Sequence, residues 1–146
     1  MDVEEEKALA RKLFNDCWDL IEKADRINLE NAEMLHLAHS SRWHWGNVGG
    51  AKEKAIGEWQ CSRVNALLGN GTAALFHAEL SRFWSADFPK SHFIHASAME
   101  ALAYAHHVLG DHKAASLYKV QALALLDGVN EKDADHIRKQ IDELPF

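Results

Sequence analysis

Residues 62–83 read SRVNALLGNGTAALFHAELSRF, and residues 103–124 read AYAHHVLGDHKAASLYKVQALA. When the two stretches are aligned on Gly69 and Gly110, apolar residues recur every three or four positions on both sides of each glycine. This spacing is the pattern of an amphipathic α-helix. Glycine adopts the left-handed conformation that ends a helix at little cost. Each stretch therefore predicts two antiparallel helices joined by a tight turn.

The residues that follow the two glycines also correspond. Asn70 aligns with Asp111, and both residue types cap the start of a helix with a side-chain oxygen. Ala74 aligns with Ala115, five residues after each glycine, where the two helices of a hairpin must cross closely. Two such units in register indicate an internal repeat.

The second unit resembles the tetratricopeptide repeat, whose helix pairs share this pattern. The matching residues are Gly110, Asp111, Ala115, Tyr118, Ala122 and Leu123. The first unit matches more loosely, through Gly69, Asn70 and Ala74, and Ser81 stands where the motif has a small alanine. The two glycines lie 41 positions apart, whereas a regular array repeats about every 34 residues. Residues 40–127 are also similar to a group of small uncharacterised bacterial proteins with tetratricopeptide-like helices.

The rest of the chain continues the helical pattern, and only Pro89 and Pro145 interrupt it. We expect an all-α, single-domain protein of about seven helices, arranged as a tetratricopeptide-like array of antiparallel hairpins. The expected helices cover residues 3–24, 28–45, 51–68, 72–84, 90–109, 111–127 and 131–143, with Asn28 as the cap of the second. Within the domain 1–146, residues 1–45 form an N-terminal helix pair, residues 51–84 and 90–127 form the repeat-like units, and residues 131–143 form a polar capping helix.

Composition and charge limit the functions to be expected. The formal net charge is -6, from 22 acidic and 16 basic residues, and no Lys/Arg stripe could follow a phosphate backbone, so no nucleic-acid partner is expected. No stretch approaches the ~18 apolar residues of a membrane span, and the N-terminus lacks a secretory signal, so we expect a cytoplasmic protein without a membrane partner. Cys17 and Cys61 stand apart without a C-x-x-C motif and are expected to be buried free thiols.

Histidines are the main candidates for chemistry. His36 with His39, and His92 with His95, have the three-residue spacing at which two imidazoles on a helix can share a metal ion. The alternative function is therefore a metal-binding helical protein or an enzyme that uses these clustered histidines. No catalytic motif and no cofactor motif accompanies them, so we predict a protein without catalytic residues or a cofactor.

The histidine- and tryptophan-rich stretch LHLAHSSRWHWGN, residues 35–47, favours a structural role. Trp43 and Trp45 are expected to fill space between helix layers, because large aromatic rings contribute much of a protein's buried apolar area. His44 is expected to supply a partner for an indole N–H.

The resemblance also implies a binding groove. Its first helices would present Trp59 and Arg63 in one unit, and Glu100, Tyr104 and His107 in the other. Arg, Trp and Tyr dominate the hot spots of protein interfaces. We therefore predict a non-catalytic interaction scaffold that binds a protein or peptide, or a second copy of the chain, through these residues. The competing interpretation is that Trp59 and Tyr104 belong to the core.

Overall fold

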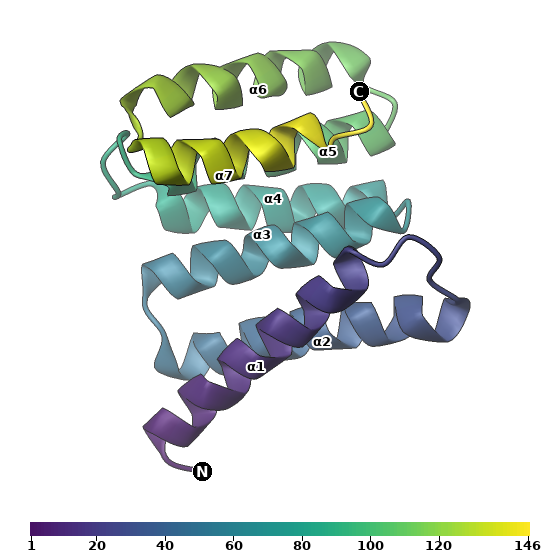
Figure 1. Ribbon diagram of the computed structural model, residues 1–146, viewed down its shortest axis with the longest axis vertical. Coiled ribbons are helices and arrows are strands. Elements are labelled where there is room, and N and C mark those ends of the chain that lie inside the picture. Colours follow the sequence, from purple (N-terminus) through teal and green to yellow (C-terminus); the bar gives the residue numbers. More distant parts are fainter.

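The computed structural model describes residues 1–146 and contains seven α-helices, one short 3-10 helix and no strand (Figure 1). This confirms the all-α class expected from the sequence. The helices are α1 (Val3–Ile21), α2 (Asn28–Val48), α3 (Ala51–Leu67), α4 (Gly71–Ser85), α5 (Phe93–Val108), α6 (His112–Leu125) and α7 (Glu131–Asp142), with the 3-10 turn Leu126–Gly128 before α7.

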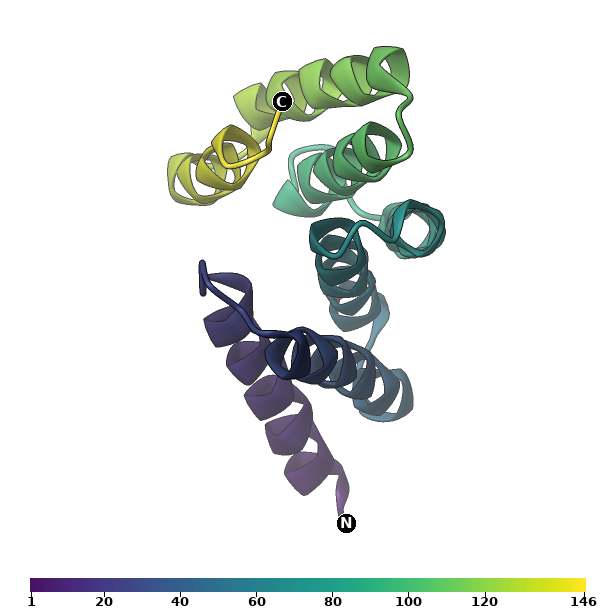
Figure 2. The same cartoon turned by 90° about the vertical axis from the view of Figure 1, so that its right-hand side faces the viewer.

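Consecutive helices pack against each other along the whole chain, from α1 on α2 to α5 on α6. Contacts also join α3 to α5 and α5 to α7, which are not neighbours in sequence. Figure 1 shows the resulting stack, with α1 and α2 at one end and α6 at the other. Seen from the side, α7 and the C-terminal end of α1 lie on the same side of the molecule, and α4 lies on the opposite side (Figure 2). No helix combines the length and the apolar character that a membrane span needs.

The two glycine turns form as the sequence predicts. Gly69 has φ +79° and Gly110 has φ +83°, and these are the two residues of the chain with a left-handed backbone. Asp111 then caps α6, because its side-chain oxygen accepts the backbone N–H of Ala114 at 3.1 Å. Asn70 precedes α4 without such a side-chain bond. The first turn therefore lacks the side-chain cap that the second turn has.

Helix α5 contacts four other helices, α3, α4, α6 and α7. Its alanines, Ala96, Ala98, Ala101, Ala103 and Ala105, are all at most 4% exposed. Side chains this small allow neighbouring helix axes to approach closely on several sides at once, which a helix of leucines would prevent. The alanine-rich composition therefore explains why this helix can be surrounded.

Some helix ends differ from the expected ones for local reasons. Helix α5 begins at Phe93 rather than at residue 90, because Pro89 starts a turn and His92 then acts as the cap, its Nδ1 accepting the N–H of Ile94 at 3.2 Å. The expected cap Asn28 is instead the first residue of α2. Ile27 occupies the cap position, and its backbone N–H donates to the Glu30 carboxylate at 3.0 Å. A glutamate reaching back from the first turn thus replaces the cap.

The expectation that Trp43 fills the core is wrong, because its side chain is 68% exposed. The buried residues of α2 are Met34, Ala38 and Ser41, and the next step of this stripe leads to Trp45, which is half-buried. Trp43 lies two positions earlier, on the opposite face of the helix. His44 likewise contacts no indole, since its Nδ1 lies 2.8 Å from a carboxylate oxygen of Glu6.

The two cysteines are free and buried, as expected. They lie in one apolar cluster with Met34, Ala38 and Val64, where α1, α2 and α3 meet. Burial raises the pKa of Cys17 to about 12 and also raises the pKa of Cys61. Both residues therefore remain neutral thiols that fill the core near neutral pH.

Candidate binding groove

A groove opens between α1 and α7, with α3 and α5 at its base. It contains a cavity of about 420 Å³, a size within the range of binding sites for peptides and small molecules. Most of the cavity wall is apolar. The cavity is lined by Phe14, Trp18, Glu22, Ala55, Ile56, Trp59, Ser81, Phe93, Ile94, Ser97, Asp133, His136, Ile137 and Gln140.

Helical spacing explains how the two walls form. Phe14 and Trp18 are four residues apart, so they share one face of α1, and Glu22, four residues further on, is the C-cap of that helix. Asp133, Ile137 and Gln140 share one face of α7 in the same way. Each wall therefore presents a continuous strip of side chains to the groove.

A second hollow of about 200 Å³ extends the groove. It shares Phe14 and Ile56 with the larger cavity, so the two hollows lie side by side. Beyond these two residues it reaches Trp45 on α2 and Arg11 and Glu53 at its edge. The groove is therefore long enough to take more than one side chain of a bound segment.

Four of the five predicted groove residues contact one another at the base of this cavity. They are Trp59, Arg63, Glu100 and Tyr104. The indole Nε1–H of Trp59 donates to Glu100 Oε2 at 2.5 Å, and Arg63 Nη2 lies 3.1 Å from Glu100 Oε1. The Arg63 guanidinium is also stacked near two rings, 5.6 Å from the centre of Trp59 and 5.3 Å from the centre of Tyr104. These contacts join α3 to α5.

Burial defines the electrostatics of this cluster. Glu100 is 1% exposed and Arg63 is 7% exposed. Burial raises the pKa of Glu100, while the Arg63 guanidinium and the hydrogen bond from Trp59 act in the opposite direction. Burial also raises the pKa of Tyr104. The ion pair is shielded from water and connects α3 to α5 at the base of the groove.

The predicted residues therefore occupy different positions relative to the groove. Trp59 borders the cavity but is only 4% exposed, whereas Arg63, Glu100, Tyr104 and His107 are not part of the cavity lining. The burial of Trp59 and Tyr104 agrees with the competing interpretation that these two residues belong to the core. The His107 ring stacks on Phe146, with ring centres 4.5 Å apart, because the C-terminal residues return over that end of α5. A direct contact between these four residues and a partner stays a prediction.

The sequence reasoning did not identify Phe14, Trp18, Ile56 and Phe93 as groove residues. One signal could have found the first two. Phe14 and Trp18 are aromatic residues four positions apart, directly beside the stripe of α1 that contains Cys17. A second apolar strip on one helix indicates a second surface to be covered. Ile56 and Phe93 carry no comparable signal, since their exposure depends on where α1 and α7 lie.

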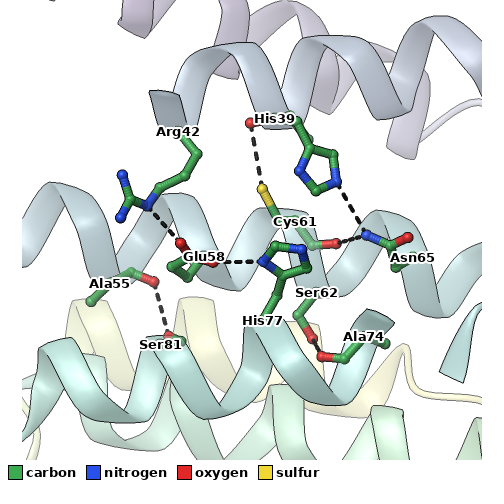
Figure 3. A network of polar contacts seen from close by, with 11 residues as sticks. His39, Arg42, Ala55, Glu58, Cys61, Ser62, Asn65, Ala74, His77 and Ser81 are labelled. Atoms are coloured by element: carbon green, nitrogen blue, oxygen red, sulfur yellow. Dashed lines mark hydrogen bonds and ion pairs between the residues drawn. The ribbon is translucent and has the colours of Figure 1, made fainter. Parts of the chain in front are cut away.

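A second polar cluster joins α2, α3 and α4 on another side of the molecule (Figure 3). The Glu58 carboxylate, 4% exposed, accepts a hydrogen bond from Arg42 Nε at 2.7 Å and contacts His77 Nδ1 at 2.7 Å. The rings of His77 and His39 meet edge to face, with centres 4.9 Å apart. Burial, and the neighbouring His77, lower the pKa of His39. Glu58 thus connects the side chains of two flanking helices.

The four histidines proposed as metal ligands do not form two similar pairs. His39 packs against the His77 ring, and its Nε2 lies 3.3 Å from Asn65 Nδ2, whereas His36 has no such contacts with other helices, and both histidines are exposed. His92 caps α5, and His95 Nε2 lies 2.7 Å from the backbone oxygen of Phe88. No group of three or more His, Cys, Asp or Glu side chains is placed to hold a metal ion. A metal-binding or enzymatic role of these histidines stays a prediction.

Comparison of the chain with protein-family models, with curated proteins and with solved structures finds no match.

Proposed function

We propose that this protein is a non-catalytic scaffold that binds a segment of a partner protein in the groove between α1 and α7. The observation that carries the proposal is the cavity of about 420 Å³, whose wall contains Phe14, Trp18 and Phe93. Each of these rings is only half-buried. Aromatic residues in a concave apolar surface are the usual anchors of protein recognition.

The arrangement of the helices supports a tetratricopeptide-like array. Both hairpins turn at a glycine with positive φ, and Ala74 and Ala115, five residues later, are at most 1% exposed. Helical arrays of this class bind extended or helical segments along the surface that their first helices form. In this proposal α1, α3, α5 and α7 are the first helices, and all four contribute residues to the cavity lining.

The buried cluster of Arg63, Glu100 and Trp59 favours a rigid groove. Its ion pair connects α3 to α5, and Arg63 Nη2 also lies 3.4 Å from the backbone oxygen of Gln140 on α7. These contacts hold α3, α5 and α7 together before any segment binds. A preformed site loses less conformational entropy on binding than a flexible one.

A random library of displayed peptides, each about 15 residues long, tests this function when it is selected for binding to the full chain. We expect selected peptides to bind the wild-type protein and to lose at least about tenfold in affinity for the variant Ile56→Glu, because a carboxylate would be buried under the bound side chains. Ile56 lines both hollows of the groove.

The matched control is Phe76→Glu, which places the same carboxylate on the exposed outer side of α4, where Phe76 is 63% exposed. This variant should bind the selected peptides like the wild type. Selection of no peptide, or of peptides that depend on Phe76 and not on Ile56, would overturn the proposed function.

A further inference from the structure

The groove carries acidic groups and few basic ones. Among the residues that line the larger cavity, the ionisable side chains are Glu22, Asp133 and His136, and there is no lysine or arginine. Glu22 is exposed at the C-terminal end of α1, and Asp133 is half-buried on α7, so a carboxylate borders each wall. A bound segment would therefore meet negative charge from both sides.

Two basic groups lie next to the groove. Arg11 lines the smaller hollow together with Glu53. Arg26, which follows α1, donates to the backbone oxygens of Leu20, Ile21 and Lys23 and keeps its positive charge near the end of α1. The ionisable groups that line the larger cavity itself are still the two carboxylates and His136.

The aromatic rings of the groove favour cations as well. Trp18 and Trp59 stack with ring centres 5.5 Å apart, and the faces of aromatic rings attract positive charge. The protein already uses this chemistry beneath the cavity, where Arg63 lies against Trp59 and Tyr104 and pairs with Glu100. Trp18 and Glu22, four residues apart in the sequence, both line the cavity, and Glu22 is exposed.

We infer, on the basis of the proposed function, that the segment bound in the groove is basic and amphipathic, with apolar side chains in the cavity and a lysine or arginine against Glu22 and Asp133. The apolar side chains supply most of the affinity, because burial of apolar surface is the main driving force of association. The cation decides which segments bind. A second copy of this chain, with its net charge of -6, is a less complementary partner than a basic segment.

Two synthetic peptides test the inference. Both are amphipathic helices of about 15 residues with the same leucine positions, and their polar positions carry lysine in one and glutamate in the other. We expect the lysine peptide to bind the full chain about tenfold more tightly at low salt. The preference should shrink as salt is raised, because exposed charge pairs are screened.

The double variant E22Q/D133N isolates the two carboxylates. It should lower the preference for the lysine peptide to about twofold or less. The control E33Q/E79Q removes the same charge from exposed positions on α2 and α4, outside the cavity lining, and should retain most of the preference.

The outcomes separate this inference from the function on which it rests. Equal or tighter binding of the glutamate peptide would overturn the inference, as would an Ile56-dependent library selection that yields only acidic or uncharged peptides. In both cases the groove would still be a peptide-binding site. Failure of both synthetic peptides, together with a library that yields no peptide dependent on Ile56, would overturn the proposed function itself.

Discussion

Replacement of Glu100 by alanine is expected to lower the free energy of unfolding by about 3–5 kcal/mol. The substitution leaves the Arg63 guanidinium, 7% exposed, without its carboxylate partner at 3.1 Å. It also removes the acceptor of the Trp59 indole N–H. A buried charge and a buried donor without partners are among the most destabilising changes that a single substitution can cause. Urea unfolding followed by circular dichroism measures the effect.

A double variant shows whether the lost charge balance causes this effect. Replacing both partners, in R63M/E100L, removes the two charges together and keeps similar apolar volume. We expect it to lie within about 1–3 kcal/mol of the wild type, because no buried charge is left unpaired and only two neutral groups, the Trp59 N–H and the backbone oxygen of Gln140, lose their partners. If the double variant were no more stable than E100A, the ion pair would not be the reason for the loss.

Replacement of Glu58 by alanine is expected to cost about 3 kcal/mol. Glu58 accepts from Arg42 and contacts His77, each at 2.7 Å, so its removal breaks the polar link between α2, α3 and α4. The cost should be lower than at Glu100, since the side chains of Arg42 and His77 are 20% and 17% exposed and can recruit water. The same urea titration measures it.

The control for Glu58 is Glu79→Ala on α4, which removes an exposed glutamate and should change the stability by at most about 0.5 kcal/mol. Equal losses for the two variants would contradict the role assigned to the buried carboxylate. A loss for E58A larger than that for E100A would reverse the expected order of the two clusters.

Local patterns in the sequence predict most of the fold. The glycines at residues 69 and 110 and the cap Asp111 act within one helix turn, so their effect can be read from neighbouring residues. The alanines of α5 likewise indicate a helix against which neighbouring helices pack at a short distance between their axes. The helix ends that differ from the prediction have local causes. At the start of α2, for example, the Glu30 carboxylate rather than the Asn28 side chain accepts a hydrogen bond from a backbone N–H.

The candidate groove could be predicted only in part, because it depends on contacts between residues far apart in the sequence. Alignment of the two repeat-like units places Trp59, Arg63, Glu100 and Tyr104 on facing helices, and the structure brings them together. Nothing local shows that Glu100 neutralises Arg63 and removes both from the surface. The covering of His107 by Phe146 depends on the path of the last residues of the chain, which no repeat pattern determines.

The position of α1 decides which aromatic residues are open to a partner. Phe14 and Trp18 lie on the face of α1 that meets α3 and α7 across the cavity. The direction of a helix relative to distant helices is set by the packing of the whole stack. For this reason the sequence indicates that α1 has an apolar side, but it does not show that two of its rings border an open groove.

The most direct test of a groove between α1 and α7 is a nuclear magnetic resonance titration of the indole N–H signals of the full chain with the lysine peptide. We predict that the signals of Trp18 and Trp59, which line the cavity, shift together as the peptide is added. The signal of Trp43, which is 68% exposed on α2, should stay in place. A shift of Trp43 without a shift of Trp18 and Trp59 would place the binding surface elsewhere and would contradict the account.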